Sequence, residues 1–185
     1  MSREFETVLA THCAPLLFGK KPAILIQDAP ALRRCDWDLL RHHGLRVLRM
    51  RKRQGNSLVF VYNPALLGQT LNRPLVRRSL SSFGYECETL TALLDELQRR
   101  VLTSREFPHE IGFFLGYPPE DVLAFIAERD GDCRKCELCG TWKVYGDAAS
   151  AAATFDEYAH YRRTLLQEIA VGRSIFNVIP SALAG

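Results

Sequence analysis

The sequence predicts a single α+β domain that is mostly helical and has a small antiparallel sheet. Apolar residues recur at helical spacing in several segments, and two β-rich runs flank a glycine-containing turn. The chain of 185 residues, 47% hydrophobic and 24% charged, has the composition of an ordinary globular protein. This length suits one domain with a real core, so we expect a single domain over residues 1–185.

The first part of the chain predicts two helices around a short buried segment. Apolar residues follow the i, i+3, i+4, i+7 spacing after a Ser2 cap, and Pro15 should end or kink this helix at about Cys13. Residues 23–26 are an apolar run that periodicity assigns neither to helix nor to strand. A second helix is expected from residue 36 to Gly44, where a left-handed residue would stop it.

The sheet is expected to rest on a hairpin. Residues 45–50 and 58–62 are β-rich and are joined through residues 54–56, whose glycine suits a turn. The hairpin carries a basic run, which is typical of charged strand edges that resist aggregation: Arg46, Arg49, Arg51, Lys52 and Arg53. The net charge of +3 adds no strong nucleic-acid signal.

Prolines and caps delimit the helices expected in the second part of the chain. Helices should begin near Pro64, Pro74, Thr89, Pro119 and Ala148. Residues 109–116 fit a helix or a strand, and the proline before them with the glycine at their end favours a helix. Residues 141–145 are expected to be a strand that joins the hairpin in the sheet, and the last dozen residues are expected to fray.

Several motifs spread over most of the chain resemble the bacterial family known as domain of unknown function 3793 (DUF3793). They are His12-Cys13-Ala14-Pro15 with Lys21-Pro22, Phe107-Pro-His-Glu-Ile-Gly with Leu115-Gly-Tyr-Pro and Glu120-Asp121-Val122, and Cys139-Gly with Trp142-Lys-Val-Tyr-Gly-Asp147. The resemblance implies no established activity. It marks as family-like positions His12, Cys13, His109, Glu110, Tyr117, Trp142 and Tyr145.

The expected compartment decides how the six cysteines are interpreted. No apolar run approaches the roughly 20 residues that span a bilayer, and the polar start lacks the pattern of a signal peptide. We therefore expect a cytoplasmic protein without a membrane partner. In a reducing cytosol, a close group of cysteines is more typical of metal binding or thiol chemistry than of a disulfide framework.

The most specific spacing is a run of three cysteines at intervals of three residues, a pattern whose thiolates can converge on one metal ion. The ligands expected for such a site are Cys133, Cys136, Cys139 and His109. His12, expected on the apolar face of the first helix, and Cys13 are the other candidates for the fourth ligand. Zinc is favoured over an iron–sulfur cluster, because Gly140 stands where the ferredoxin pattern has proline. Incidental reduced cysteines and redox-active thiols remain the alternatives.

A second hypothesis is a thiol-dependent enzyme that uses Cys13 as nucleophile and His109 as base. Glu110 or Asp147 would orient the histidine. The position of Cys13 near a helix end argues against it, because the helix dipole raises a thiol pKa there. The alternative is a buried Cys13 that packs as a small hydrophobe.

The aromatic residues suggest two further interpretations. Tyr117, Trp142 and Tyr145 could stack on a planar ligand or cofactor, or they could be ordinary core and rim residues. The third class of function is an interaction module without chemistry that docks a protein or redox partner. The absence of a phosphate-binding glycine loop from the sequence is compatible with that class.

Overall fold

The computed structural model describes residues 2–27, 39–50, 57–86, 88–104, 106–128 and 136–180. The protein is mostly helical with small antiparallel sheets, which confirms the predicted α+β class. Contacts divide the chain into two compact units, which are described here separately. Unit 1 comprises Met1–Leu66 and Tyr158–Gly185, and unit 2 comprises Leu67–Glu157. The single domain expected over residues 1–185 stays a prediction.

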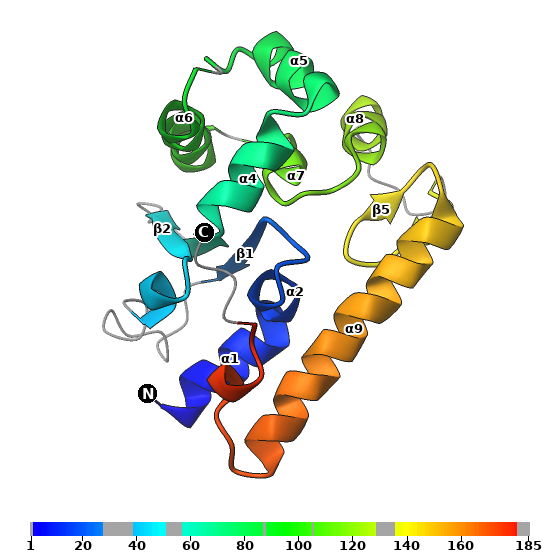
Figure 1. The fold of residues 1–185 in the computed structure, drawn as a ribbon. Helices are drawn as coiled ribbons and strands as arrows, with labels where there is room; N and C mark the ends of the chain where they lie inside the picture. The colour runs from blue at the N-terminus through cyan, green and yellow to red at the C-terminus, as the bar shows by residue number, and fades with distance from the viewer. Residues whose placement is uncertain are drawn as a thin grey trace. The chain divides into compact units, whose positions relative to one another are not determined.

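The sheet of unit 1 has the strand order β1–β3–β2 and is antiparallel throughout (Figure 1). Its strands are β1 (Ala23–Gln27), β2 (Arg46–Met50) and β3 (Leu58–Tyr62). The predicted pairing of the two β-rich runs is confirmed, and the apolar run of undetermined type is the strand β1. Central β3 is buried on both faces, which explains its uninterrupted run of apolar residues.

Three features predicted for unit 1 lie outside the described residues. These are the start of the second helix at residue 36, the turn at residues 54–56 and the basic side chains 51–53. Residues 39–42 are helical, and Gly44 has a φ of 71°. Its conformation is the left-handed one that was predicted to stop this helix.

Unit 1 begins with two consecutive helices. The Ser2 hydroxyl caps α1 (Arg3–His12) by accepting a hydrogen bond from the Phe5 N–H at 3.2 Å. The α1 helix ends before Cys13 and α2 (Ala14–Leu17) follows, with Pro15 in its first turn, as predicted. The prediction that His12 lies on the apolar face is wrong. Its side chain is exposed, and the buried residues of α1 are Phe5, Leu9 and Ala10.

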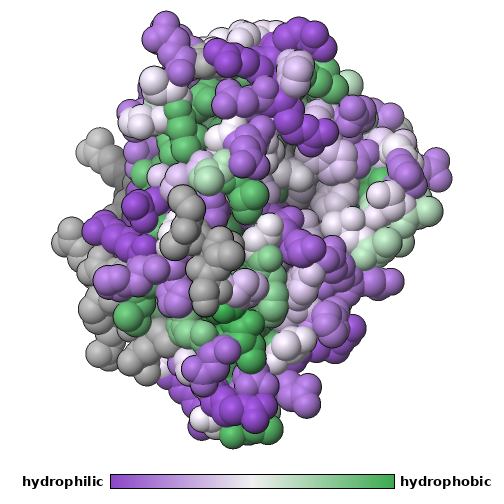
Figure 2. All heavy atoms as spheres, in the orientation of Figure 1, coloured by the Kyte–Doolittle hydropathy of each residue, from purple (hydrophilic) through white to green (hydrophobic). Residues whose placement is uncertain are grey.

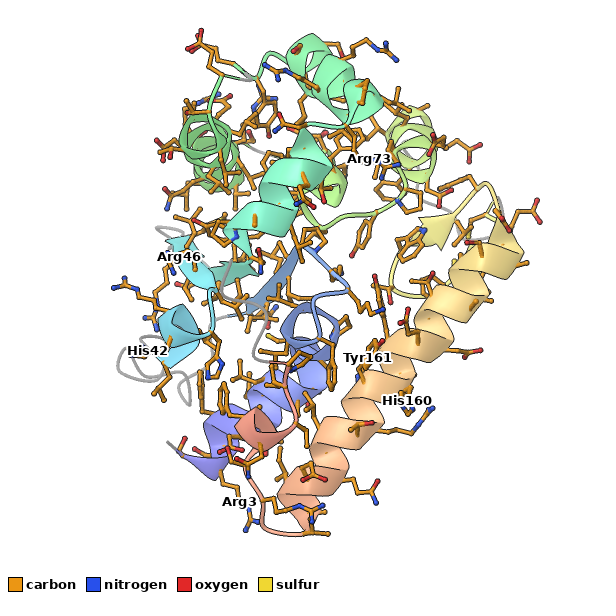
Figure 3. All side chains as sticks on the ribbon, viewed as in Figure 1. Arg3, His42, Arg46, Arg73, His160 and Tyr161 are labelled. Atoms are coloured by element: carbon orange, nitrogen blue, oxygen red, sulfur yellow. The ribbon has the colours of Figure 1, made fainter. Side chains whose placement is uncertain are left out.

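The second half of helix α9 (Ala148–Ala170) belongs to unit 1. Tyr161 lies on this helix (Figure 3). Its ring stacks on Phe18, which follows α2, with ring centroids 4.4 Å apart. The predicted long final helix is confirmed.

The segment that follows α9 belongs to unit 1 and is packed into its core as far as Ile179. A short 3-10 helix, η2 (Ile175–Asn177), follows α9, and the Ile175 N–H donates to the Glu6 carboxylate at 2.9 Å. Ile175 is fully buried, as is most of Ile179. The expected fraying of the last dozen residues is therefore wrong up to Ile179, because apolar side chains anchor this part of the chain. Residues 181–185 lie outside the described part.

Unit 2 consists mainly of short helices, several of which begin at a proline or after a capping residue (Figure 1). Its helices are α4 (Pro64–Leu71, which starts in unit 1), α5 (Pro74–Ser82), α6 (Leu90–Thr103), α7 (Ile111–Phe114) and α8 (Pro119–Ala127). The Thr89 hydroxyl caps α6 by accepting from the Ala92 N–H at 3.1 Å. Residues 109–116 contain the helix α7, so the favoured alternative is confirmed, and Gly116 follows it with a φ of 75°.

A hairpin of two short strands completes unit 2. The strand β4 (Leu138–Cys139) pairs antiparallel with β5 (Lys143–Val144). Among the described residues, β5 pairs with β4 and forms a sheet separate from β1–β3–β2. The prediction that the Trp142 strand joins the first hairpin is therefore wrong. Local pairing across a tight turn satisfies its backbone without a distant partner.

Figure 2 shows the hydropathy of one face of the molecule. Hydrophilic residues cover most of the face drawn in Figure 2, with hydrophobic residues in smaller areas among them. None of the helices in the described residues combines the length and the apolar character needed to cross a membrane.

Candidate functional site

The β4–β5 hairpin of unit 2 contains the predicted site residues Cys139 and Trp142. Hydrogen bonds to Asp121 of α8 fix the position of this hairpin. Oδ2 of Asp121 accepts a hydrogen bond from the Trp142 indole N–H at 2.8 Å. Oδ1 accepts from the backbone N–H groups of Tyr145 and Gly146 at 2.8 and 3.0 Å. Asp121 is only 4% exposed, so these donors compensate a buried carboxyl group. In the sequence, Asp121 stands in the motif Glu120-Asp121-Val122, which did not predict this role.

The sulfur atoms of Cys136 and Cys139 meet at the start of this hairpin, 2.8 Å apart. Cys136 is half-buried and carries a reduced thiol. Cys139 is exposed and disulfide-bonded. Within the described ranges, no group of three or more His, Cys, Asp or Glu is arranged to hold a metal ion. Cys133, the third predicted ligand, lies outside those ranges.

His109 lies just before α7 with its side chain exposed. Its ring meets the edges of two phenylalanine rings, with centroids 5.1 Å from Phe125 and 6.3 Å from Phe107. His109 and Cys139 line the same cavity. The fold thus brings one predicted histidine and one predicted cysteine to one place, although they are 30 residues apart in the sequence.

This cavity has a volume of about 470 Å³, is open to solvent, and is lined by residues of α7, α8 and the hairpin. Its lining is mostly apolar and aromatic, and the polar side chains within it are few. Tyr117 and Trp142, both predicted to bind a cofactor, line the cavity and stack with ring centroids 5.3 Å apart and an interplanar angle of 29°. Burial raises the pKa of Tyr117 to about 12, so its phenol stays protonated at neutral pH.

Tyr145, the third residue predicted to bind a cofactor, has a different environment. It follows β5, and its side chain is not among those that line the cavity in the described part of unit 2. Its hydroxyl oxygen is buried and has no hydrogen-bond partner among the described residues. Burial, followed by the charges of Glu128 and Cys136, raises the pKa of Tyr145.

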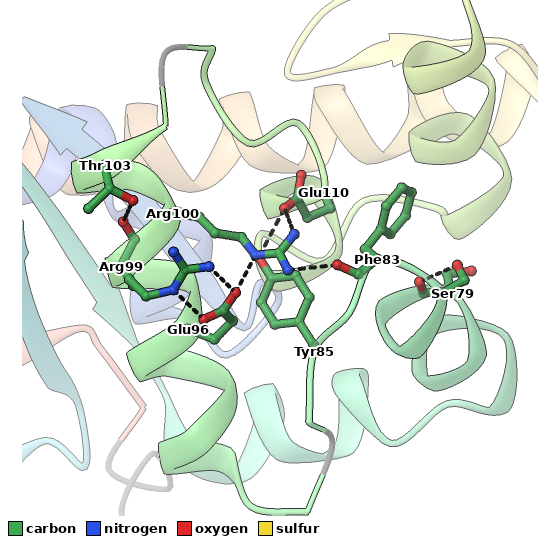
Figure 4. Close-up of polar contacts among 9 residues, drawn as sticks. Ser79, Phe83, Tyr85, Glu96, Arg99, Arg100, Thr103 and Glu110 are labelled. Atoms are coloured by element: carbon green, nitrogen blue, oxygen red, sulfur yellow. Dashed lines mark hydrogen bonds and ion pairs between the residues drawn. The ribbon is translucent and has the colours of Figure 1, made fainter.

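Glu110 belongs to a buried polar network (Figure 4). Its Oε1 accepts from the Tyr85 hydroxyl and from Arg100 Nη1, each at 3.1 Å. The Arg100 guanidinium also donates to Glu96 at 2.6 Å and to the Phe83 carbonyl at 2.6 Å. Burial and the nearby Glu110 carboxylate raise the pKa of Tyr85. The described contacts of Glu110 are therefore structural, and no hydrogen bond in this part of the chain joins it to the His109 ring.

Cys13 lies in the core of unit 1, whereas His109 belongs to unit 2. Its side chain is fully buried among apolar residues, including Leu9 and Leu17. Burial raises the pKa of the Cys13 thiol to about 12, and the positive charge of the nearby Lys21 only partly opposes this. The thiol is thus protonated at neutral pH and packs as a small hydrophobe, which does not favour a nucleophile.

Comparison with protein-family models gives a match over most of the chain. A family model described as a protein of unknown function (DUF3793) matches residues 9–179, nearly the whole chain. No curated protein matches the chain, and no solved structure does.

Proposed function

The chain belongs to the DUF3793 family of proteins of unknown function, and we propose that its unit 2 binds a transition-metal ion at the β4–β5 hairpin. The observation that carries this proposal is the convergence of the Cys136 and Cys139 sulfur atoms, 2.8 Å apart. Two thiolates in a C-x-x-C spacing, with two residues between them, are ligands that zinc prefers. The β4–β5 pairing begins just after Cys136 and includes Cys139, so the two cysteines belong to one short hairpin.

The remaining ligands are proposed from the sequence and from the cavity. Cys133 continues the same spacing and supplies a third thiolate. His109 supplies a neutral imidazole as the fourth ligand, and it lines the same cavity as Cys139. Three thiolates and one imidazole form a common tetrahedral zinc set. The proposed role of the ion is structural or redox-linked, and the protein need not be an enzyme.

The proposal applies to the reduced protein. A sulfur atom in a disulfide, as at Cys139, is not available as a thiolate ligand. We therefore place the protein in a reducing compartment such as the cytoplasm, where thiols stay reduced. Zinc is favoured over an iron–sulfur cluster, because four cysteines are usual for the latter and the hairpin region offers three.

Metal analysis of the protein, purified under reducing conditions without a chelator, tests this proposal. We expect close to one zinc ion per chain, no visible absorbance band, and loss of the metal when Cys136 and Cys139 are both changed to serine. The matched control is Cys13→Ala, which removes a buried thiol of unit 1 and should leave the metal content unchanged. Metal well below one per chain that does not depend on the hairpin cysteines would overturn the proposal.

The two other hypotheses stay predictions. The burial and high pKa of Cys13 give no support to a thiol enzyme that pairs it with His109. An interaction module that docks a protein partner is the remaining hypothesis if the hairpin binds no metal.

A further inference from the structure

We infer that the cavity of unit 2 binds a planar aromatic small molecule that carries an anionic group. The cavity lies between α7, α8 and the β4–β5 hairpin. Its volume of about 470 Å³ is within the range of pockets that bury cofactor-sized ligands, roughly 300–1,000 Å³. The inference does not depend on the proposed metal ion, because other side chains of the same unit carry it.

The aromatic wall of the cavity is held in place before any ligand binds. The Trp142 indole donates to Asp121 at 2.8 Å, and the ring of Phe155 packs edge-on against it at a centroid distance of 4.5 Å. Tyr117 stacks on the same indole. A rigid aromatic surface of this kind favours a flat ring, since stacking costs little side-chain entropy when the protein rings are already ordered.

Two glycines that line the cavity leave room for these rings. A Cβ atom at Gly112 would lie 2.8 Å from a methyl group of Val122 and 3.3 Å from the Tyr117 ring. A Cβ atom at Gly140 would overlap the ring of Phe155. A side chain at either position would therefore displace the residues that shape the wall.

The charge of the lining selects an anionic ligand. The Lys143 ammonium group lies 5.5 Å from the centroid of the Phe125 ring, and in the described part of the chain it makes no ion pair. Asp121 is the acidic residue of the lining, and its carboxylate already accepts three hydrogen bonds from N–H groups. The cation is therefore available to a ligand, whereas the negative charge is compensated.

Fluorescence titration with a matched pair of probes tests the inference. Naphthalene-2-sulfonate is flat and anionic, and naphthalene-2-sulfonamide has the same rings without the charge. Trp37→Phe leaves Trp142 as the reporter tryptophan of the chain. We expect the sulfonate to quench Trp142 saturably and to bind more tightly than the sulfonamide, with an affinity that falls as salt is added.

Lys143→Met is the decisive variant, because it removes the charge but keeps an unbranched side chain. We expect it to bind the sulfonate about tenfold more weakly than the parent, as for a lost charge-assisted contact, and to leave sulfonamide binding nearly unchanged. Lys20→Met, an exposed lysine of unit 1, is the control and should change neither affinity. Circular dichroism should show the same fold for all three chains.

The result that would overturn the inference is the absence of saturable Trp142 quenching by the sulfonate, or equal sulfonate affinity in the parent and in Lys143→Met. Sulfonate binding that persists in the chain with both Cys136→Ser and Cys139→Ser separates this inference from the metal proposal. Loss of metal without loss of aromatic binding would leave the cavity inference intact.

Discussion

Both units place a cysteine near a lysine, but in opposite environments. In unit 1, Cys13 is fully buried and Lys21 is 4% exposed. In unit 2, Cys139 is exposed and faces the half-buried Lys143 across the β4–β5 ladder. The same two residue types thus form part of a core in unit 1 and part of a cavity rim in unit 2.

Burial, rather than residue type, therefore distinguishes the cysteine and lysine that pack in a core from those that could bind a ligand. Burial raises the pKa of the Cys13 thiol and lowers that of the Lys21 amine, so both groups are driven towards their neutral forms. The hairpin residues keep access to solvent and to a cavity.

The largest expected effect is on alkylation of Cys13. Its pKa rises from 9.0 to about 12, so the thiolate population at pH 8 falls by about a thousandfold relative to the unfolded chain. We expect iodoacetamide to modify Cys136 in the folded, reduced protein long before it modifies Cys13, as followed by peptide mass spectrometry. In denaturant both should react at similar rates. Equal rates in the folded protein would remove the contrast between the units.

Removal of the Asp121 carboxylate should destabilise unit 2. Asp121→Ala leaves three N–H donors of the hairpin without their acceptor, which should lower the free energy of unfolding by about 3 kcal/mol. Urea unfolding followed by circular dichroism measures the change. The control Asp95→Ala, on the exposed side of α6, should shift it by less than about 0.5 kcal/mol. Similar effects for both variants would show that Asp121 does not anchor the hairpin.

Lys21 should give unit 1 a stability that rises with pH. Burial lowers its pKa from 10.5 to about 8, so between these values the unfolded chain binds more protons than the folded one. The cost of burying the charge is fully present below pH 8 and is relieved as pH rises. We expect the stability advantage of Lys21→Met over the parent to shrink by about 2 kcal/mol between pH 7.5 and 9.5.

Urea unfolding of both chains at several pH values within this window measures the difference. Comparison of the two chains largely cancels the other titrating groups, among them Cys13, whose raised pKa lowers stability at higher pH. A difference in the free energy of unfolding that stays constant across this pH window would show that burial of the charged Lys21 amine does not destabilise the folded protein.

The smallest effect concerns the polar network of unit 2. Tyr85→Phe removes the hydroxyl that donates to Glu110 at 3.1 Å while Arg100 still donates to the same oxygen. We expect a loss of about 1 kcal/mol, as is usual for one buried hydrogen bond. Tyr158→Phe, whose exposed hydroxyl donates only weakly at 3.5 Å, is the control. A loss for Tyr85→Phe no larger than that of the control would show that the network adds little stability.

Local signals in the sequence predicted most of the helices. Ser2 and Thr89 cap their helices through side-chain hydrogen bonds, and Pro74 and Pro119 begin theirs, because these residues act on backbone groups within one turn. The strand β1 could not be assigned in the same way. Its partner β3 lies more than thirty residues away, and an apolar run of this length fits either a helix or a strand.

The candidate site was predicted only in part. The spacing of Cys136 and Cys139 and the motif around Trp142 pointed to the hairpin, because these residues are close in the sequence. The role of Asp121 was missed, since its hydrogen bonds cross more than twenty residues. The partners of Glu110 were missed for the same reason: Tyr85 is 25 residues away.

X-ray absorption at the zinc edge of the reduced protein identifies the atoms that bind the ion. The proposed site predicts a sulfur shell of three thiolates at about 2.3 Å and one nitrogen at about 2.0–2.1 Å. It also predicts that this shell disappears when Cys136 and Cys139 are changed to serine and persists in Cys13→Ala. Zinc surrounded only by oxygen and nitrogen, or a sulfur shell that is unchanged without the hairpin cysteines, would contradict it.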